Sequence, residues 1–352
     1  MNSLFDIIYV PFGYVLRFFN QICGGHYILT LLLFAVTVKV LMIPFSIKQQ
    51  KNQVKGAMLR PKMAIIEKKY AGKTDQASLM QKRQELMDMQ QREGYNPLAG
   101  CLPLLIQMPI IMALYRIIRC PLTYICRFSE KLVAEIYNVA TTLKDSPVFG
   151  ADTISTEGDV VWKTIKNIDQ IKLVSTIKHN SDAFTSLEGF SLDTIPNFDV
   201  FGGWINLTET PSFRFGQGAN PWLLLIPVLT FATAIITSKL SKKYNGTLQQ
   251  ELAGQTDEQR ASSAMMEWSM PLMSLAFTFM LNAALGVYWV YQSVISIGQM
   301  VLFNKIWPMP TFTPEQIREY ERSLKRKPKP SAPDPNRPKP RSLHHIDDDD
   351  DI

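Results

Sequence analysis

Long apolar runs without formal charge alternate with charged stretches along the chain. A helix needs ~20 mostly apolar residues to cross ~30 Å of hydrocarbon, and several runs reach that length. Every backbone amide must be bonded within its own segment there, and these runs lack the alternating polarity of barrel strands. The pattern therefore predicts an all-α polytopic membrane protein with five spans, at residues 26–47, 97–119, 220–239, 267–283 and 285–306.

The last two spans come from one apolar run, residues 268–304, which is longer than a single span requires. Asn282 and Gly286 lie in its middle and are typical of a turn, so we expect a two-helix hairpin.

The first residues, 1–22, are apolar but interrupted by Asp6 and Pro11, and they show no basic start or small-residue cleavage site of a signal peptide. We expect an outer interfacial helix, broken at Pro11, whose apolar face lies on the headgroups; the alternative is an extension of the first span. The expected face consists of Leu4, Ile7, Ile8, Val15, Leu16 and Phe19.

Charge is distributed unevenly between the segments that join the spans. Residues 48–96 carry eleven Lys or Arg against five acids, which places them in the cytoplasm by the positive-inside rule. The loop 240–266 and the basic, Pro-rich tail 308–352, expected to be disordered, then fall on the same side, and the segment 120–219 lies outside. This predicts an N-out, C-in topology, with Arg116 and Arg119 reaching the outer headgroups.

The cytoplasmic segment 48–95 has two helical halves separated by residues 71–74, with Thr74 or Asp75 placed to cap the second half and Gly94 to end it. It predicts a projecting helical hairpin. The apolar positions are rich in methionine, which suits either an adaptable surface for capturing substrates or a plain coiled-coil seam, and spacing alone favours the seam. The methionines are Met58, Met63, Met80, Met87 and Met89.

One charge, Lys39, interrupts the first span. No Asp or Glu lies inside the five predicted spans to pair with it, since Glu267 stands at the very start of the fourth, before the apolar run 268–304. A lysine at the centre of a span costs ~2.5–3.5 kcal/mol on insertion scales. The side chain either snorkels past a kink at Pro44 to the inner headgroups or faces a water-filled cavity open to the cytoplasm.

Polar residues in the other spans favour the cavity. Tyr288, Gln292, Ser296 and Gln299 share one helix face by their spacing. A single Ser or Thr more often joins two helices, but here every span carries polar groups. The candidate groove residues are Lys39, Gln107, Thr230, Thr233, Ser274, Thr278, Tyr288, Tyr291, Gln292 and Ser296.

The four cysteines, Cys23, Cys101, Cys120 and Cys126, lack metal-ligand spacing, so we expect no metal and no cofactor, while a Cys23–Cys126 disulfide stays open. No nucleophile and base pair lies at membrane depth, so we expect no catalytic residues and no enzyme activity. A small-solute transporter would show inverted repeats and usually an intramembrane carboxylate, and neither is evident.

Three motifs resemble the YidC insertase family, whose relatives include the Oxa and Albino proteins of organelles. They are residues 38–45 (Val-Lys-Val-Leu-Met-Ile-Pro-Phe), residues 96–110, which begin Asn-Pro-Leu-Ala-Gly-Cys, and residues 285–289 (Leu-Gly-Val-Tyr-Trp). The resemblance covers about residues 1–125 and 200–308. The outer segment 128–198 is longer than expected for small members of the family and has no assigned role. It lacks the length of the large outer domain typical of Gram-negative members, so the resemblance favours a Gram-positive type.

The resemblance implies an insertase of the bacterial cell membrane that works without covalent chemistry. Lys39, which stands where the family often has arginine, would draw the acidic end of a nascent membrane protein into a groove, while the apolar part enters lipid. The implied partners are nascent chains, the lipid bilayer, the Sec translocon, and the ribosome through the basic tail and cytoplasmic loops. The alternative is a Sec-accessory chaperone without insertion activity of its own.

Overall fold

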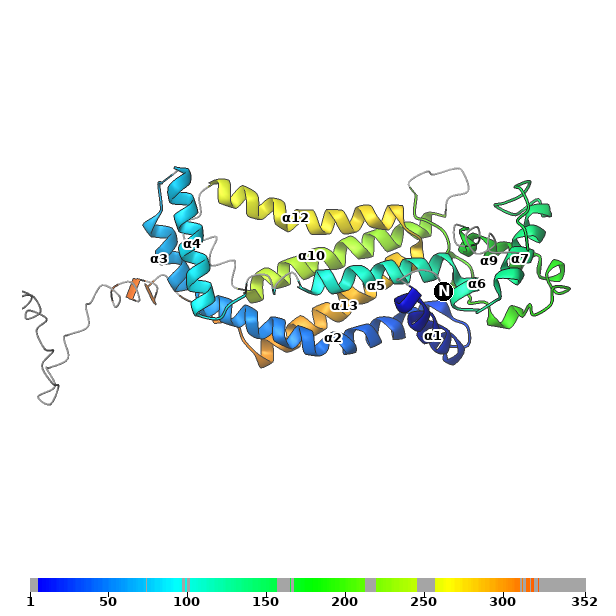
Figure 1. Cartoon of the computed structure of the whole chain (residues 1–352), viewed down its shortest axis with the longest axis horizontal. Coiled ribbons are helices and arrows are strands. Elements are labelled where there is room, and N and C mark those ends of the chain that lie inside the picture. The colour runs from blue at the N-terminus through cyan, green and yellow to red at the C-terminus, as the bar shows by residue number, and fades with distance from the viewer. Residues whose placement is uncertain are drawn as a thin grey trace, which may run out of the picture.

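In the computed structural model of the chain, the described residues are 6–310 except 74, 97, 98, 100, 101, 157–164, 166, 167, 213–219 and 246–256, with 312, 315, 316, 318, 319 and 322. Regular structure among them is helical apart from one two-stranded hairpin. Long helices lie side by side along the molecule (Figure 1), which confirms the all-α class. They are α2 (Tyr27–Met58), α5 (Leu102–Arg119), α10 (Leu225–Asn245), α12 (Asp257–Met280) and α13 (Ala283–Ile306).

Three stretches of the described residues are long and apolar enough to cross a membrane: Tyr27–Met58, Pro221–Tyr244 and Ala283–Ile306. The apolar part of α12, Pro271–Met280, is shorter. The predicted spans within α5 and α12 therefore stay predictions. In the bundle, α13 packs between α2 and α10, α12 packs on α10, and α5 contacts α13 and the N-terminal helix α1 (Asp6–Ile22).

The turn between α12 and α13 is shorter than expected. Asn282 caps α13, whereas Gly286 lies inside the helix, so its prediction as a turn residue was wrong. A Cβ on Gly286 would lie 2.5 Å from Ile226 Cγ2 and 3.2 Å from Thr278 Cγ2. Glycine here lets α13 approach α10 and α12 closely, as small residues do in membrane bundles.

Helix α2 continues through Pro44 and ends at Met58, well beyond the predicted inner end of the first span at residue 47. Two shorter helices follow, α3 (Arg60–Lys69) and α4 (Gln76–Arg92). Asp75 caps α4 by accepting a hydrogen bond of 2.8 Å from Ser78 N, and Gly94 follows it with a φ of +63°. Helices α3 and α4 contact each other and form a helical hairpin, and Thr74 lies outside the described residues.

The base of the hairpin is tied to α2. The Asn52 side chain donates to Asn96 O at 2.8 Å and accepts from Asn96 N at 3.3 Å. Lys55 Nζ donates to Gly94 O at 3.0 Å, and the Tyr95 ring lies where a Cβ on Gly56 would be. These contacts fix the direction in which α3 and α4 leave the bundle.

Helix α1 also continues through Pro11, so the predicted break at that residue was wrong. Leu16 was assigned to the lipid face, but it is fully buried in the core cluster that includes Leu31 of α2. The helix has two apolar faces. The face with Leu16 packs against the core, and the opposite face is exposed. The exposed face consists of Ile7, Pro11, Tyr14, Phe18 and Ile22, and Leu4 lies outside the described residues.

The described residues of the segment 120–219 form a domain, here called the 120–219 domain, at the opposite end of the molecule from the hairpin (Figure 1). Its buried side chains form one core cluster with those of the bundle. They include Leu132, Ile136, Ile171, Val174, Ile177, Phe184 and Phe198. Its elements are α6 (Pro121–Tyr124), α7 (Glu130–Thr142), α9 (Gln170–His179), η2 (Ser181–Ala183), η3 (Leu192–Thr194), β1 (Asp199–Val200) and β2 (Ile205–Asn206), followed by η4 (Pro221–Leu224).

This domain holds the near ends of the long helices. Tyr27 N, at the start of α2, donates to Asn197 O at 3.1 Å. Ala283 N, at the start of α13, donates to Glu209 O at 2.7 Å. Arg119, at the end of α5, pairs with Asp169 at 3.3 Å, so its charge is met by the protein and the expected reach to headgroups was wrong.

The cysteines of the domain are buried thiols. Burial raises the pKa of Cys120 to about 11 and that of Cys126 to about 12. Cys126 Sγ donates to Thr194 O at 3.4 Å, and Cys23 is a free thiol as well. The alternative of a Cys23–Cys126 disulfide is therefore not adopted, and Cys101 lies outside the described residues.

Replacing Gly13 of α1 by alanine should lower the free energy of unfolding by about 1–3 kcal/mol, because a Cβ would lie 2.8 Å from the backbone oxygen of Tyr124. Gly298→Ala in α13 is the matched control, since nothing lies within 4 Å of its Cβ and alanine favours the helix by about 0.5–1 kcal/mol. Denaturant unfolding of the purified protein in detergent measures both. Equal stability of the two variants would contradict the tight α1–α6 contact.

Candidate functional site

The charged residue of the first span lies at the contact between α2 and α13. Lys39 Nζ donates to Ser296 Oγ at 2.6 Å, and Ser296 Oγ in turn donates to Gln292 O at 2.6 Å. Lys39 is partly exposed and, in the part of the chain that the structure describes, forms no ion pair. The ammonium is therefore satisfied in part by a hydroxyl, but its charge is not neutralised.

Hydrogen bonds continue from this contact toward the end of the bundle that holds the 120–219 domain. Gln292 Nε2 donates to the Tyr288 hydroxyl at 2.9 Å and lies 3.4 Å from Ala35 O. Gln107 Nε2 of α5 donates to the same hydroxyl at 3.5 Å. We call Lys39, Gln107, Tyr288, Gln292 and Ser296 the Lys39 network, which spans α2, α5 and α13.

Burial changes along the network. Tyr288 is 2% exposed and Gln292 is 8% exposed, whereas Ser296 and Lys39 are both partly open. Gln292 Oε1 is buried and has no hydrogen-bond partner among the described residues. The network is therefore most buried at Tyr288 and Gln292, and it is partly exposed at Gln107 and at Lys39, where it ends in a positive charge.

The three threonines among the remaining predicted groove residues form hydrogen bonds within their own helices and not with the Lys39 network. Thr230, Thr233 and Thr278 donate to carbonyls of their own helices, at 2.9, 2.8 and 3.1 Å. Ser274 and Thr278 are buried on the face of α12 that packs against the other helices. Tyr291 of α13 packs against the core. Hydroxyls bonded within their own helix lower the cost of helix contacts in hydrocarbon without forming a polar path.

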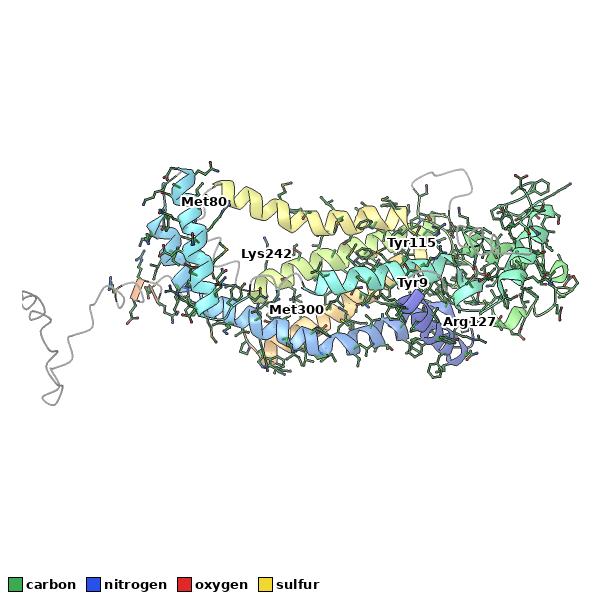
Figure 2. All side chains as sticks on the ribbon, viewed as in Figure 1. Tyr9, Met80, Tyr115, Arg127, Lys242 and Met300 are labelled. Atoms are coloured by element: carbon green, nitrogen blue, oxygen red, sulfur yellow. The ribbon has the colours of Figure 1, made fainter. Side chains whose placement is uncertain are left out.

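The hairpin exposes much of its methionine surface. Met58, Met80 and Met87 are 57%, 65% and 53% exposed, and Met63 and Met89 are partly buried. Met63 lies between the arms, where its Sδ accepts from Gln90 Nε2 at 3.8 Å, as a seam would require. The seam does not account for the three exposed methionines. Figure 2 shows Met80 on the hairpin, at the opposite end of the molecule from Arg127.

Polar pairs also join the arms. Lys62 pairs with Glu93, and Lys69 pairs with Glu85 at 2.8 Å. The hydrogen bond from Lys69 holds the pKa of the Glu85 carboxyl below its usual value. Exposed pairs of this kind add little stability, so they set the register of the arms and leave the thioether surface free.

Sequence patterns missed the groups that fix α2 against α13. At one end these are backbone oxygens of the 120–219 domain, on Asn197, Leu207 and Glu209. At the other end Gln50 Nε2 lies 3.3 Å from Trp307 O, and Lys51 lies over the Trp307 ring. Backbone acceptors carry no side-chain signal, although the basic-aromatic pairing at Trp307 could have been considered. The Lys39–Ser296 contact lies between these two attachments.

No three His, Cys, Asp or Glu side chains within the described ranges lie together as a metal site would require. The tail residues Lys325, Arg326, Lys327 and Lys329 and the loop residues 246–256 lie outside the described part of the chain.

The helices and the Lys39 network define a polytopic membrane protein with a polar face inside its bundle. A model of the family described as 60Kd inner membrane protein matches residues 18–310. The chain belongs to this family, the YidC/Oxa family, and is of its Gram-positive type.

Individual relatives agree with that assignment. The chain is 27% identical to membrane protein insertase YidC 2 of Bacillus anthracis over 294 residues, which cover 84% of this chain and 78% of the relative. It is 25% identical to YidC 2 of Listeria innocua, over 84% of this chain and 70% of the relative. A shorter match to YidC of Clostridium perfringens reaches 35% identity over 33% of this chain and 47% of the relative.

Replacing Lys39 by leucine should leave the free energy of unfolding unchanged or raise it by up to ~2 kcal/mol, because a desolvated charge without a counter-ion is removed and Ser296 keeps its bond to Gln292 O. Gln292→Leu should instead lower it by ~1–3 kcal/mol, since Tyr288 and Ala35 O lose a buried donor. Unfolding in detergent measures both variants. A loss of stability in Lys39→Leu equal to that in Gln292→Leu would make Lys39 a structural residue.

Proposed function

We propose that this chain, a membrane protein insertase by its family, inserts nascent membrane proteins along the Lys39 network. The supporting observation is the Lys39–Ser296 contact: a positive charge inside the bundle, partly exposed, with no carboxylate beside it among the described residues. Such a charge attracts the acidic N-terminal end of an incoming chain. The substrates are then nascent membrane proteins, and the second partner is the lipid itself.

Magnitudes indicate how the work is divided. Two unit charges 4 Å apart attract by about 1 kcal/mol in water and about 4 kcal/mol near a protein surface. Moving one Leu, Ile or Phe side chain out of water contributes about 1.5–3 kcal/mol, and a span contains many of them. Transfer of apolar side chains into lipid therefore drives insertion, while Lys39 directs the polar end and selects among substrates. No covalent step is needed.

The hairpin is proposed as the first contact for the emerging segment. Its exposed thioethers lie on a support fixed by Asn52, Lys55 and Tyr95, and flexible methionine side chains adapt to many apolar sequences. The segment would pass from there to the open side of the Lys39 network and then between the long helices into lipid. The wider groove set, with Thr230, Thr233, Ser274, Thr278 and Tyr291, is proposed to line this path by packing.

The chain is a protein of the bacterial cell membrane. We further propose the N-out, C-in orientation, which places the basic hairpin and tail in the cytoplasm and the acidic 120–219 domain outside. Contact with the ribosome through basic residues is a proposal that rests on charge. Contact with the Sec translocon is a proposal that rests on the family resemblance.

A Sec-accessory chaperone is the alternative to an independent insertase. Reconstituting the purified protein in liposomes without Sec components, with a short single-span substrate, distinguishes them. Insertion of the substrate supports the independent activity, and failure with a verified folded protein leaves the accessory role.

In a strain depleted of its own insertase, Lys39→Arg should retain insertion of acidic-tailed substrates, because the positive charge is kept. Lys39→Glu should reduce it more than Lys39→Leu, since repulsion of roughly 1–4 kcal/mol replaces attraction of similar size. Protease protection of the substrate's translocated end measures insertion. Wild-type insertion by Lys39→Leu would contradict the role of the charge.

A photo-crosslinking amino acid at Met80 should capture a ribosome-bound nascent chain carrying an apolar segment. The same probe at Ile66, which is 8% exposed between the arms, is the matched control and should capture little. Crosslink yield on gels measures both. Equal yields at the two positions would show that capture does not follow the exposed methionine surface.

A further inference from the structure

The tip of the β1–β2 hairpin in the 120–219 domain has an unusual backbone. Phe201, Gly202 and Gly203 follow one another with φ angles of +55°, +70° and +94°, and Trp204 comes next. Left-handed backbone is routine for glycine but uncommon for a bulky residue such as phenylalanine. Strained residues of this kind persist where the surrounding structure enforces them, and they mark positions that display a side chain for a purpose.

The tip points its large side chains away from the protein. Phe201 is 72% exposed and Trp204 is 62% exposed, whereas the strand residues Val200 and Ile205 are buried at 7% and 6%. The hairpin therefore fills its own part of the core without the two aromatic rings. Two exposed aromatic rings on a strained turn indicate that this surface contacts an apolar partner and not water alone.

Hydrogen bonds and ring contacts place the tip at the ends of two long helices. Asn197, two residues before β1, accepts from Tyr27 N at the start of α2. The Asn220 side chain donates to Trp204 O, and the Trp204 ring stacks on Trp222 at 5.5 Å. Trp222 lies in η4, which leads directly into α10. The depth of the tip relative to the bilayer is thus set by α2 and α10.

Exposed apolar residues on the first turns of these helices continue the surface of the tip. Leu29 of α2 is 46% exposed, and a cavity of about 700 Å³ separates it from the tip, lined also by His26, Ile28 and residues 199–203. On α10 the exposed residues are Trp222, Leu225 and Val228. Both helices are long and apolar enough to cross the membrane, and exposed apolar residues on such helices are suited to contact with lipid.

We propose that residues 201–204 form a membrane anchor that inserts into the interfacial region of the leaflet next to the 120–219 domain. The indole rings of Trp204 and Trp222 lie at headgroup depth, Phe201 reaches below them, and a phospholipid of that leaflet fills the cavity beside Leu29. Tryptophan suits this depth because its ring is apolar and its N–H can meet water or headgroups. The anchor steadies the domain that holds the starts of α2 and α13.

Depth measurement on the full chain in phosphatidylcholine vesicles tests the anchor and needs no substrate, so it is independent of the insertion mechanism. Phe201→Cys is made in a Cys23→Ser, Cys101→Ser background and labelled with the fluorophore NBD. The buried thiols of Cys120 and Cys126 stay unlabelled in folded protein and so report folding. The control is Phe149→Cys, an aromatic position that is 54% exposed and follows α7, away from the long helices.

The anchor predicts that lipid carrying a shallow nitroxide quenches NBD at position 201 several-fold more than at position 149, while iodide present on both sides of the vesicles shows the reverse order. Equal quenching by lipid at both positions, or free access of iodide to position 201, would overturn it. If labelling of Cys120 or Cys126 shows that Phe201→Cys is unfolded, the same comparison is made with Trp204→Cys, and the same two outcomes decide.

Discussion

A polar group in hydrocarbon must be hydrogen-bonded by protein or water, and the contact between α2 and α13 satisfies that requirement only in part. Lys39 finds the Ser296 hydroxyl but no carboxylate among the described residues, so its charge keeps its full attraction for an incoming acid. Toward Tyr288 the same face is buried and bonded to α5. One face of α13 is thus buried and hydrogen-bonded to α5 at Tyr288, and partly exposed beside an unpaired charge at Ser296.

The two ends of this contact are held by different means. Backbone oxygens of the 120–219 domain bond the first amides of α2 and α13, where helix N-termini otherwise leave donors unsatisfied. Near the hairpin, Gln50 and Lys51 meet Trp307. The 120–219 domain therefore supports the ends of the two helices between which the Lys39 contact lies.

The sequence predicted the all-α class, a helix cap at Thr74 or Asp75 and a shared helix face for Gln292 and Ser296, because hydropathy, capping and helical spacing are properties of single segments. It failed where two segments meet. Gly286 is the kind of residue found in turns, but it is required here by contact with Ile226. Leu16 belongs to an apolar stripe, yet no stripe tells whether it faces lipid or protein. Thr230 and Thr233 fit a groove by composition, and their bonds to their own helix become visible only in three dimensions.

Helix α2 is one uninterrupted rod from the 120–219 domain to the base of the hairpin. Its 32 residues extend about 48 Å, with Lys39 about 18 Å from the end held by Asn197. A displacement of the hairpin is therefore transmitted along the same helix that carries Lys39. Since Gln50 couples α13 to the same rod, Ser296 is carried along with it. Mechanical pull by a chain under synthesis would thus be felt at the charge without breaking its hydrogen bond.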